Sequence, residues 1–232
     1  QIFRDVPCGV GRESLLRLGH ADLDRVLETG VRWMVEHGYG QPEDIEFCEE
    51  RGQMRGADPD RTHRLLRVIT SFLVKWHERQ RKAIDSIDGM LVLDDIVGFI
   101  GEDDFRRFAM PYLKELYSAK VSVKFFHNDA DCAQSVKYYP EIGINLYNPG
   151  IQMTAAELYA ATGNRLTILG NIPPRDVLAR GTPDDVRASV RKLLTETRDL
   201  SRLVPSCGGG VPPGVTTENL RAFIEEARAE RG

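Results

Sequence analysis

Short apolar runs that end at polar residues alternate with helical patterns along most of this chain. The most pronounced run begins at Val121, and its β-branched and aromatic residues end abruptly at His127, Asn128 and Asp129. Such a run predicts a buried strand with polar groups at its carboxyl end.

The same pattern recurs in the later part of the chain. Apolar runs precede the polar residues Asp94 and Asp95, Asn148, Asn171, and the Ser206-Cys207-Gly208 turn. Amphipathic helical patterns over residues 103–117 and 183–197 separate some of these runs. Strands that alternate with helices predict an α/β fold with a parallel sheet, in which catalytic groups gather at the carboxyl ends of the strands. We therefore expect these polar strand ends to face one cleft.

A long amphipathic helix is predicted before the first of these strands. Asp60 or Thr62 can cap it, and the pattern continues to about Asp85. Its expected buried face consists of Leu65, Leu66, Val68, Ile69, Phe72, Leu73 and Trp76. We interpret His63 and His77 on this helix as surface or core residues rather than metal ligands.

The first 60 residues differ in character from the rest. Cys8-Gly-Val-Gly-Arg predicts a glycine turn, since neither a strong apolar strand nor a helix start brackets it. A helix is predicted from Ala21 to His37, with Gly38 as its end, and a second short helix includes Ile45 and Phe47.

Charge and composition exclude some functional classes. A formal net charge of -4 and a pI near 5.8 provide no basic footprint for nucleic acid or an anionic membrane. No apolar run approaches the roughly 20 residues of a membrane span. The scattered cysteines, Cys8, Cys48, Cys132 and Cys207, predict a cytoplasmic chain with reduced thiols.

The beginning of the chain resembles an internal segment of the 3'-phosphate RNA ligase family, the tRNA-splicing ligases. The matching residues are Phe3-Arg-Asp-Val-Pro, Gly9-Val-Gly, Gly30 to Gly40, Glu43-Asp44, Glu49-Glu50 and Gly56-Ala-Asp-Pro. The metal-binding residues and the guanylylated histidine of that family lie outside this segment, so the resemblance implies no ligase chemistry here.

The remainder resembles the uroporphyrinogen decarboxylase family, which includes the corrinoid-linked methyltransferases. The matching stretches are Asp58 to Leu66, Leu93-Asp-Asp-Ile, Phe105 to Leu113, His127-Asn-Asp-Ala, Glu141 to Pro149, Leu169-Gly-Asn-Ile, Gly181 to Val186 and Ser206 to Asn219. The resemblance implies a partial (β/α)8 TIM barrel over residues 61–232. A short α/β segment of different origin, residues 1–60, would precede it, as in a hybrid of two gene pieces.

The methyltransferase branch of this family uses zinc to hold a thiol as a thiolate, through a His-x-Cys pair and a later Cys. The resemblance places His127, Asp129 and Cys207 at these positions, with an aspartate where the family has its first cysteine. Aspartate also ligates zinc, so the set is chemically sensible. The resemblance implies methyl transfer from a corrinoid or another methylated donor to a small-molecule acceptor, with the corrinoid, free or on a corrinoid protein, as substrate or partner.

Other strand-end residues have alternative roles. Asp94 and Asp95 are adjacent, so in a strand they would point to opposite faces, and one of them is a candidate acid, base or partner of His127. Asp129 is a candidate base as well as a ligand. Asn148 and Asn171 are candidates for substrate binding or for stabilising turns.

Three functions stay open at this point. Metal-assisted methyl transfer is the first, and metal-independent decarboxylation of a porphyrinogen-like tetrapyrrole is the second. The third is an inactive chimera that acts as a binding module, and such a chain would be expected to self-associate into a homo-oligomer. RNA ligation is a more distant fourth.

Overall fold

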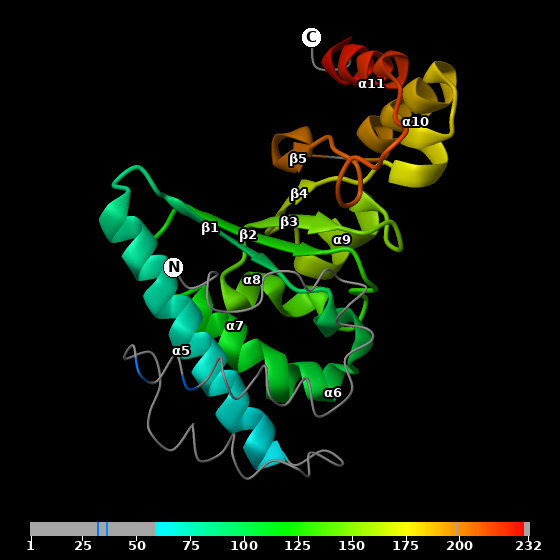
Figure 1. The fold of residues 1–232 in the computed structure, drawn as a ribbon. Helices are drawn as coiled ribbons and strands as arrows, with labels where there is room; N and C mark the ends of the chain where they lie inside the picture. Colours follow the sequence, from blue (N-terminus) through cyan, green and yellow to red (C-terminus); the bar gives the residue numbers. More distant parts are fainter. Residues whose placement is uncertain (1–31, 33–35, 37–58, 198, 230–232) are drawn as a thin grey trace. The chain divides into compact units, whose positions relative to one another are not determined.

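The computed structural model describes Arg32, Glu36 and residues 59–197 and 199–229 (Figure 1). The glycine turn, the α/β segment predicted for residues 1–60, Cys8 and Cys48 therefore lie outside the described residues, apart from the helical Arg32 and Glu36. The chain divides into two compact units, Gln1–Glu78 and Arg79–Gly232. The strands and the strand-end residues belong to the second unit.

The long helix α5 extends over Pro59–Ala83, close to its predicted bounds. The face predicted to be buried is wider than the face that the structure buries. Ile69 and Leu73 are 39% and 37% exposed, while Val68 is buried. Successive helical residues point about 100° apart, so neighbours such as Val68 and Ile69 cannot share one narrow buried stripe. Among the described residues, no helix is both long and apolar enough to cross a membrane.

A five-stranded parallel sheet forms the centre of the second unit. Its strands, in chain order and in spatial order, are β1 (Gly89–Leu93), β2 (Val123–Asn128), β3 (Leu146–Pro149), β4 (Thr167–Leu169) and β5 (Leu203–Val204). The predicted strands and the α/β class are confirmed. Because all neighbours run parallel, the carboxyl ends of the strands meet at one edge, as they do in a TIM barrel.

Helical segments follow the strands, as the alternating pattern predicts, and all but the last of them connect one strand to the next. They are η1 (Ile96–Phe99), α6 (Glu102–Asp104), η2 (Phe105–Ala109), α7 (Met110–Leu116), η3 (Val136–Tyr138), α8 (Tyr139–Ile142), α9 (Ala155–Thr162), η4 (Pro174–Ala179), α10 (Pro183–Glu196), η5 (Leu200–Arg202) and α11 (Thr217–Ala229). Figure 1 shows α7, α8 and α9 on one side of β1, β2 and β3. This placement buries one face of the sheet.

The helix predicted over residues 103–117 is interrupted. A π-helical turn, Phe105–Ala109, separates α6 from α7. Pro111 has no N–H, so an uninterrupted α-helix would leave the carbonyl of Arg107 without a donor, and the π-turn changes the pairing at this point. The helix predicted at 183–197 forms as α10, with Thr182 and Asp185 as its capping box.

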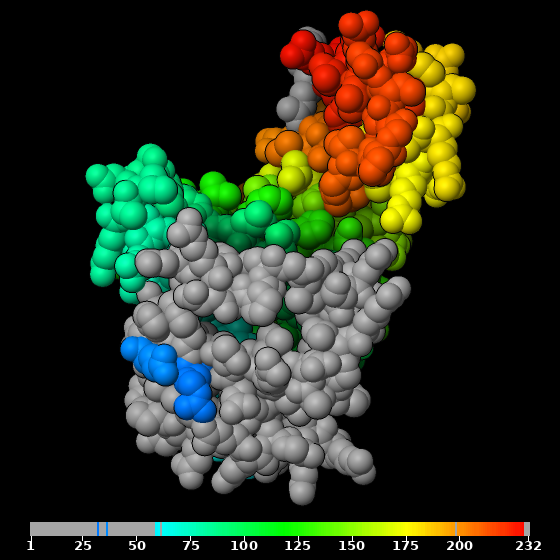
Figure 2. Space-filling model, viewed as in Figure 1, coloured from blue at the N-terminus to red at the C-terminus, as the bar shows by residue number. Residues whose placement is uncertain are grey.

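α10 and α11 pack against each other, and their surfaces adjoin in the yellow-to-red part of Figure 2. Arg191 Nε donates to Glu226 Oε1 at 2.6 Å, and Arg187 bonds Glu225 at 3.1 Å. The last helix of the chain is thus held to α10 by charged pairs as well as by the buried Ala222.

Aromatic side chains form the core beneath the sheet. The ring centroids of Phe126 and Tyr139 lie 5.1 Å apart, and those of Tyr139 and Tyr147 lie 5.0 Å apart, both edge to face. All three side chains are fully buried. The Tyr147 hydroxyl donates to the backbone oxygen of Asn128 at 3.1 Å, so this core holds the carboxyl end of β2.

The face of the sheet opposite the helices carries exposed apolar side chains on β1 and at the start of β2. Leu91 and Leu93 are 52% and 67% exposed, and Val123 of β2 is 44% exposed. In a closed eight-stranded barrel this face lines the interior and packs against the other strands. The sheet therefore has the surface of a barrel interior, which is consistent with a partial barrel.

We expect Tyr147→Phe to lower the free energy of unfolding by about 1–3 kcal/mol, because the buried Asn128 carbonyl would lose its donor. Urea denaturation followed by circular dichroism measures this. Tyr159→Phe is the matched control, since the bond from its hydroxyl to Arg202 O is only partly buried and water can replace it. An equal loss in both variants would contradict this role of Tyr147.

Candidate functional site

The polar residues at the end of β2 lie in two environments: Asn128 is in the core, and its neighbours are at the edge of the sheet. Asn128 is fully buried, and its Oδ1 accepts from the Ala130 N–H at 2.8 Å while its Nδ2 donates to the Tyr139 hydroxyl at 3.4 Å. These bonds turn the chain directly after the strand. His127 and Asp129, one residue to either side, are left at the more exposed carboxyl edge of the sheet.

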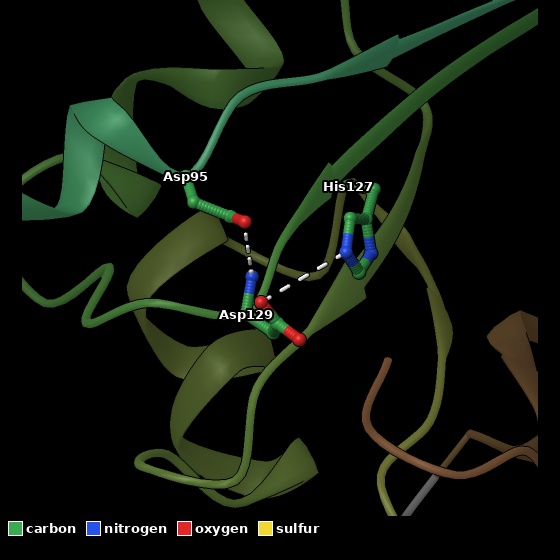
Figure 3. Close-up of side chains that lie close together, drawn as sticks. All are labelled: Asp95, His127 and Asp129. Atoms are coloured by element: carbon green, nitrogen blue, oxygen red, sulfur yellow. Dashed lines mark hydrogen bonds and ion pairs between the residues drawn. The ribbon is translucent and has the colours of Figure 1, made fainter. Parts of the chain in front are cut away.

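Asp95, His127 and Asp129 come together at this edge. One potential ligand atom from each lies within 4.8 Å of the others. Figure 3 shows Asp129 between the other two: its backbone N–H donates to Asp95 Oδ1 at 3.1 Å, and its Oδ1 lies 3.9 Å from His127 Nε2. We call this group the strand-end cluster. The His127 side chain is 18% exposed and that of Asp129 is 47% exposed, so small ligands can reach the cluster.

Asn148 on the neighbouring strand fixes the orientation of the His127 ring. His127 pairs with Asn148 in the register of β2 and β3, and His127 Nδ1 lies 2.8 Å from Asn148 Oδ1. The Asn148 Nδ2 group donates to Leu169 O at 2.5 Å and to Cys207 O at 3.3 Å, which identifies the oxygen facing His127. An amide oxygen can only accept, so Nδ1 carries the proton and Nε2 of the neutral ring presents its lone pair toward Asp129.

The turn after β5 approaches the same cluster. Gly209 has φ +75°, and a Cβ at this position would lie 2.8 Å from Asp129 Oδ2. Gly208 N donates to Ile172 O at 3.0 Å and thereby holds the turn against the end of β4. A side chain at position 209 would therefore displace the Asp129 carboxylate as well as strain the backbone.

Cys207, in this turn, is not part of the strand-end cluster. Its side chain is buried, its Sγ donates to Gly209 O at 3.5 Å, and burial raises the pKa of its thiol. Its predicted role as a metal ligand stays a prediction. His127 and Asp129, the other two predicted ligands, do lie together.

The adjacent aspartates after β1 have different surroundings. Both follow the strand rather than lie in it, since β1 ends at Leu93. Asp95 joins the cluster, whereas Asp94 Oδ1 accepts from the Ile96 N–H at 3.0 Å and burial raises the pKa of its carboxyl. Asp94 is half-buried whereas Asp95 is exposed. The catalytic roles predicted for Asp94, Asp95 and Asp129 stay predictions.

The two asparagines predicted to bind substrate donate within the chain. Both donors of Asn148 are engaged as described, and Asn171 Nδ2 donates to Gly150 O at 3.2 Å and to Met153 O at 2.7 Å. Asn171 also lines a cavity of about 210 Å³ with Met153, Ser189 and Lys192, which includes no residue of the strand-end cluster. Their substrate roles stay predictions, while their turn-stabilising bonds are observed.

Family comparison gives this geometry a context. Residues 51–230 match the family model described as uroporphyrinogen decarboxylase (URO-D). The chain belongs to this family. Among curated URO-D relatives, the uroporphyrinogen decarboxylase of Chlorobium phaeobacteroides is 27% identical over 186 residues, which cover 77% of this chain and 52% of the relative. The chain thus spans about half the length of this relative.

A methyltransferase from Methanosarcina mazei has a similar structure, with a TM-score of 0.62 over 96% of this chain and 68% of that protein. The two are 18% identical, so the likeness concerns the fold. It agrees with the TIM-barrel type that the URO-D family and the parallel sheet indicate.

Residues 1–69 match a second family model, the tRNA-splicing ligase RtcB. The ligase of Pyrococcus abyssi is 49% identical over 59 residues, which are 25% of this chain and 6% of that protein. The predicted similarity of the first segment to this ligase is therefore confirmed. The two family matches overlap over residues 51–69, and the domain boundary predicted between residues 60 and 61 falls in this overlap and stays a prediction.

We expect Gly209→Ala to lower the free energy of unfolding by about 1–2 kcal/mol, because alanine disfavours a positive φ. Gly210→Ala is the matched control, since a Cβ there meets nothing within 4 Å, and its effect should stay within about 0.5 kcal/mol. Urea denaturation of both variants checks this, and a Gly209→Ala variant as stable as Gly210→Ala would contradict the left-handed backbone conformation of Gly209.

Proposed function

We propose that this URO-D-family chain takes part in metal-assisted methyl transfer of the corrinoid-linked type, with zinc as the ion and a small thiol as the acceptor. The observation that carries the proposal is the His127–Asn148 hydrogen bond, which engages Nδ1 and directs Nε2 toward Asp129 at the carboxyl edge of the sheet. In metal sites, a ligating histidine typically donates its other ring proton in this way.

The residues present fit such an ion. Imidazole nitrogen and carboxylate oxygen are both zinc ligands, and His127 and Asp129 offer one of each within 3.9 Å. Cys207, the third ligand implied by the family resemblance, lies outside the strand-end cluster, so His127 and Asp129 are the predicted ligands that support the ion. Bound zinc would lower the pKa of a thiol so that it reacts as a thiolate.

The chain's own residues would position the reactants and receive the proton. In thiol methylation a sulfur lone pair forms the new S–C bond, the bond between the methyl carbon and the corrinoid cobalt breaks with its electron pair on cobalt, and the thiol proton leaves. Asp129 and Asp95, exposed beside His127, each offer one oxygen to the cluster, and the second oxygen of either carboxylate would accept that proton. The corrinoid, free or on a partner protein, would approach the same carboxyl edge.

Decarboxylation of a porphyrinogen-like tetrapyrrole is the second candidate, because the curated relative from Chlorobium phaeobacteroides is named as a uroporphyrinogen decarboxylase. That reaction needs no metal and requires arginines that clamp the carboxylates of the substrate. The chain spans about half the length of that relative, so this candidate rests on the half of the decarboxylase that the chain matches.

We expect purified protein to form methylated thiol from methylcobalamin and a low-molecular-weight thiol, and His127→Ala to lower the rate about 100-fold or more, because the thiol loses its activating ion. Chromatographic quantification of the thioether measures this. His77→Ala on α5 is the control and should retain the rate.

Three outcomes separate the alternatives. Methyl transfer that is equal in wild type and His127→Ala would contradict the role of the strand-end cluster. Decarboxylation of uroporphyrinogen without methyl transfer would favour the second candidate. If the protein shows neither activity, the interpretation as a hybrid that acts only as a binding module would remain.

A further inference from the structure

The third member of the strand-end cluster is Asp95, which follows β1, whereas the family resemblance indicates Cys207, which follows β5. Asp95, directly after β1, offers a carboxylate oxygen within 4.8 Å of the ligand atoms of His127 and Asp129, while Cys207 does not belong to the group. This inference rests on the metal site of the proposed function and specifies its ligands.

Asp95 is held in place beside its neighbour. The backbone N–H of Asp129 donates to Asp95 Oδ1 at 3.1 Å, so the two carboxylate residues are tied together across the ends of β1 and β2 (Figure 3). Asp94 N also donates to His127 O at 3.1 Å and extends the β1–β2 pairing to the start of the cluster. Backbone hydrogen bonds therefore set the spacing of Asp95 and His127.

The charges of the cluster also point to a cation. Within the described part of the chain, neither Asp95 nor Asp129 forms an ion pair with a lysine or arginine, and His127 Nε2 is the one nitrogen that faces them at ion-pair distance, 3.9 Å from Asp129 Oδ1. Two adjacent carboxylates repel each other, and a divalent ion between them would relieve the repulsion.

The distances between the ligand atoms are close to those in a site that holds a metal ion. Ligand atoms around one ion, each about 2.1 Å from it, lie about 3–3.5 Å apart. His127 Nε2 and Asp129 Oδ1 are 3.9 Å apart, and both aspartates are exposed, so side-chain rotations can close the remaining gap. The buried Cys207 Sγ instead donates to Gly209 O at 3.5 Å and is not among the ligand atoms that lie within 4.8 Å of one another.

We propose that Asp95, His127 and Asp129 form a site for a first-row divalent metal ion, with one nitrogen and two carboxylate oxygens as its protein ligands. Cys207 lies outside the coordination of the ion. Nitrogen and oxygen ligands of this kind suit Zn²⁺, Co²⁺, Mn²⁺ and Fe²⁺, whereas thiolates would favour softer ions.

The test is Co²⁺ binding to the full chain, by isothermal titration calorimetry and by absorption spectroscopy. We expect one Co²⁺ per chain and no thiolate-to-cobalt charge-transfer band in the near ultraviolet. Asp95→Asn, which keeps the shape of the side chain, should weaken binding about 10–100-fold or more. Cys207→Ser should bind as the wild type does.

Asp131→Asn is the matched control, because Asp131 lies in the same turn as Asp129 but caps the Ala133 N–H at 2.9 Å and is not in the cluster. Circular dichroism verifies that every variant is folded. A charge-transfer band that disappears in Cys207→Ser, with normal binding in Asp95→Asn, would overturn the inference and leave metal-assisted methyl transfer standing. Absence of Co²⁺ binding in the wild type would overturn both.

Discussion

The hydrogen bond between His127 and Asn148 is the interaction on which the candidate site depends. It joins two neighbouring strands at the same register position and determines which ring nitrogen faces the cluster. Asn148 can serve this role because its amide group is anchored by the backbone oxygens of Leu169 and Cys207. One buried asparagine thus connects the ends of β2, β3, β4 and the turn after β5, and loss of any of these contacts would loosen the imidazole.

The aromatic core supports this arrangement from the other side of the sheet. Tyr147 and Tyr139 bond the backbone and the side chain of Asn128, so the turn that carries Asp129 begins from a rigid point. The sheet therefore has a tightly packed face under the helices and an apolar, exposed face at Leu91 and Leu93. The exposed face is what a barrel interior looks like when some of its strands do not belong to the sheet.

The two family similarities cover unequal parts of the chain. Residues 51–230 belong to the URO-D family, whereas the ligase similarity ends at residue 69 and covers 6% of the Pyrococcus abyssi ligase. The strand-end cluster lies wholly in the URO-D portion. Asp129 stands where the resemblance to the methyltransferase branch implies a cysteine.

The sequence by itself determined the α/β class, the strands and the polar residues at their ends, because alternation of apolar runs and helical periods depends only on local order along the chain. It also indicated His127 and Asp129 as a pair. Only the tertiary structure decided that Asp95 joins them rather than Cys207, and that Asn148 orients the imidazole. Those choices depend on strand register and on the path of turns, where residues far apart in sequence meet at distances that no local pattern encodes.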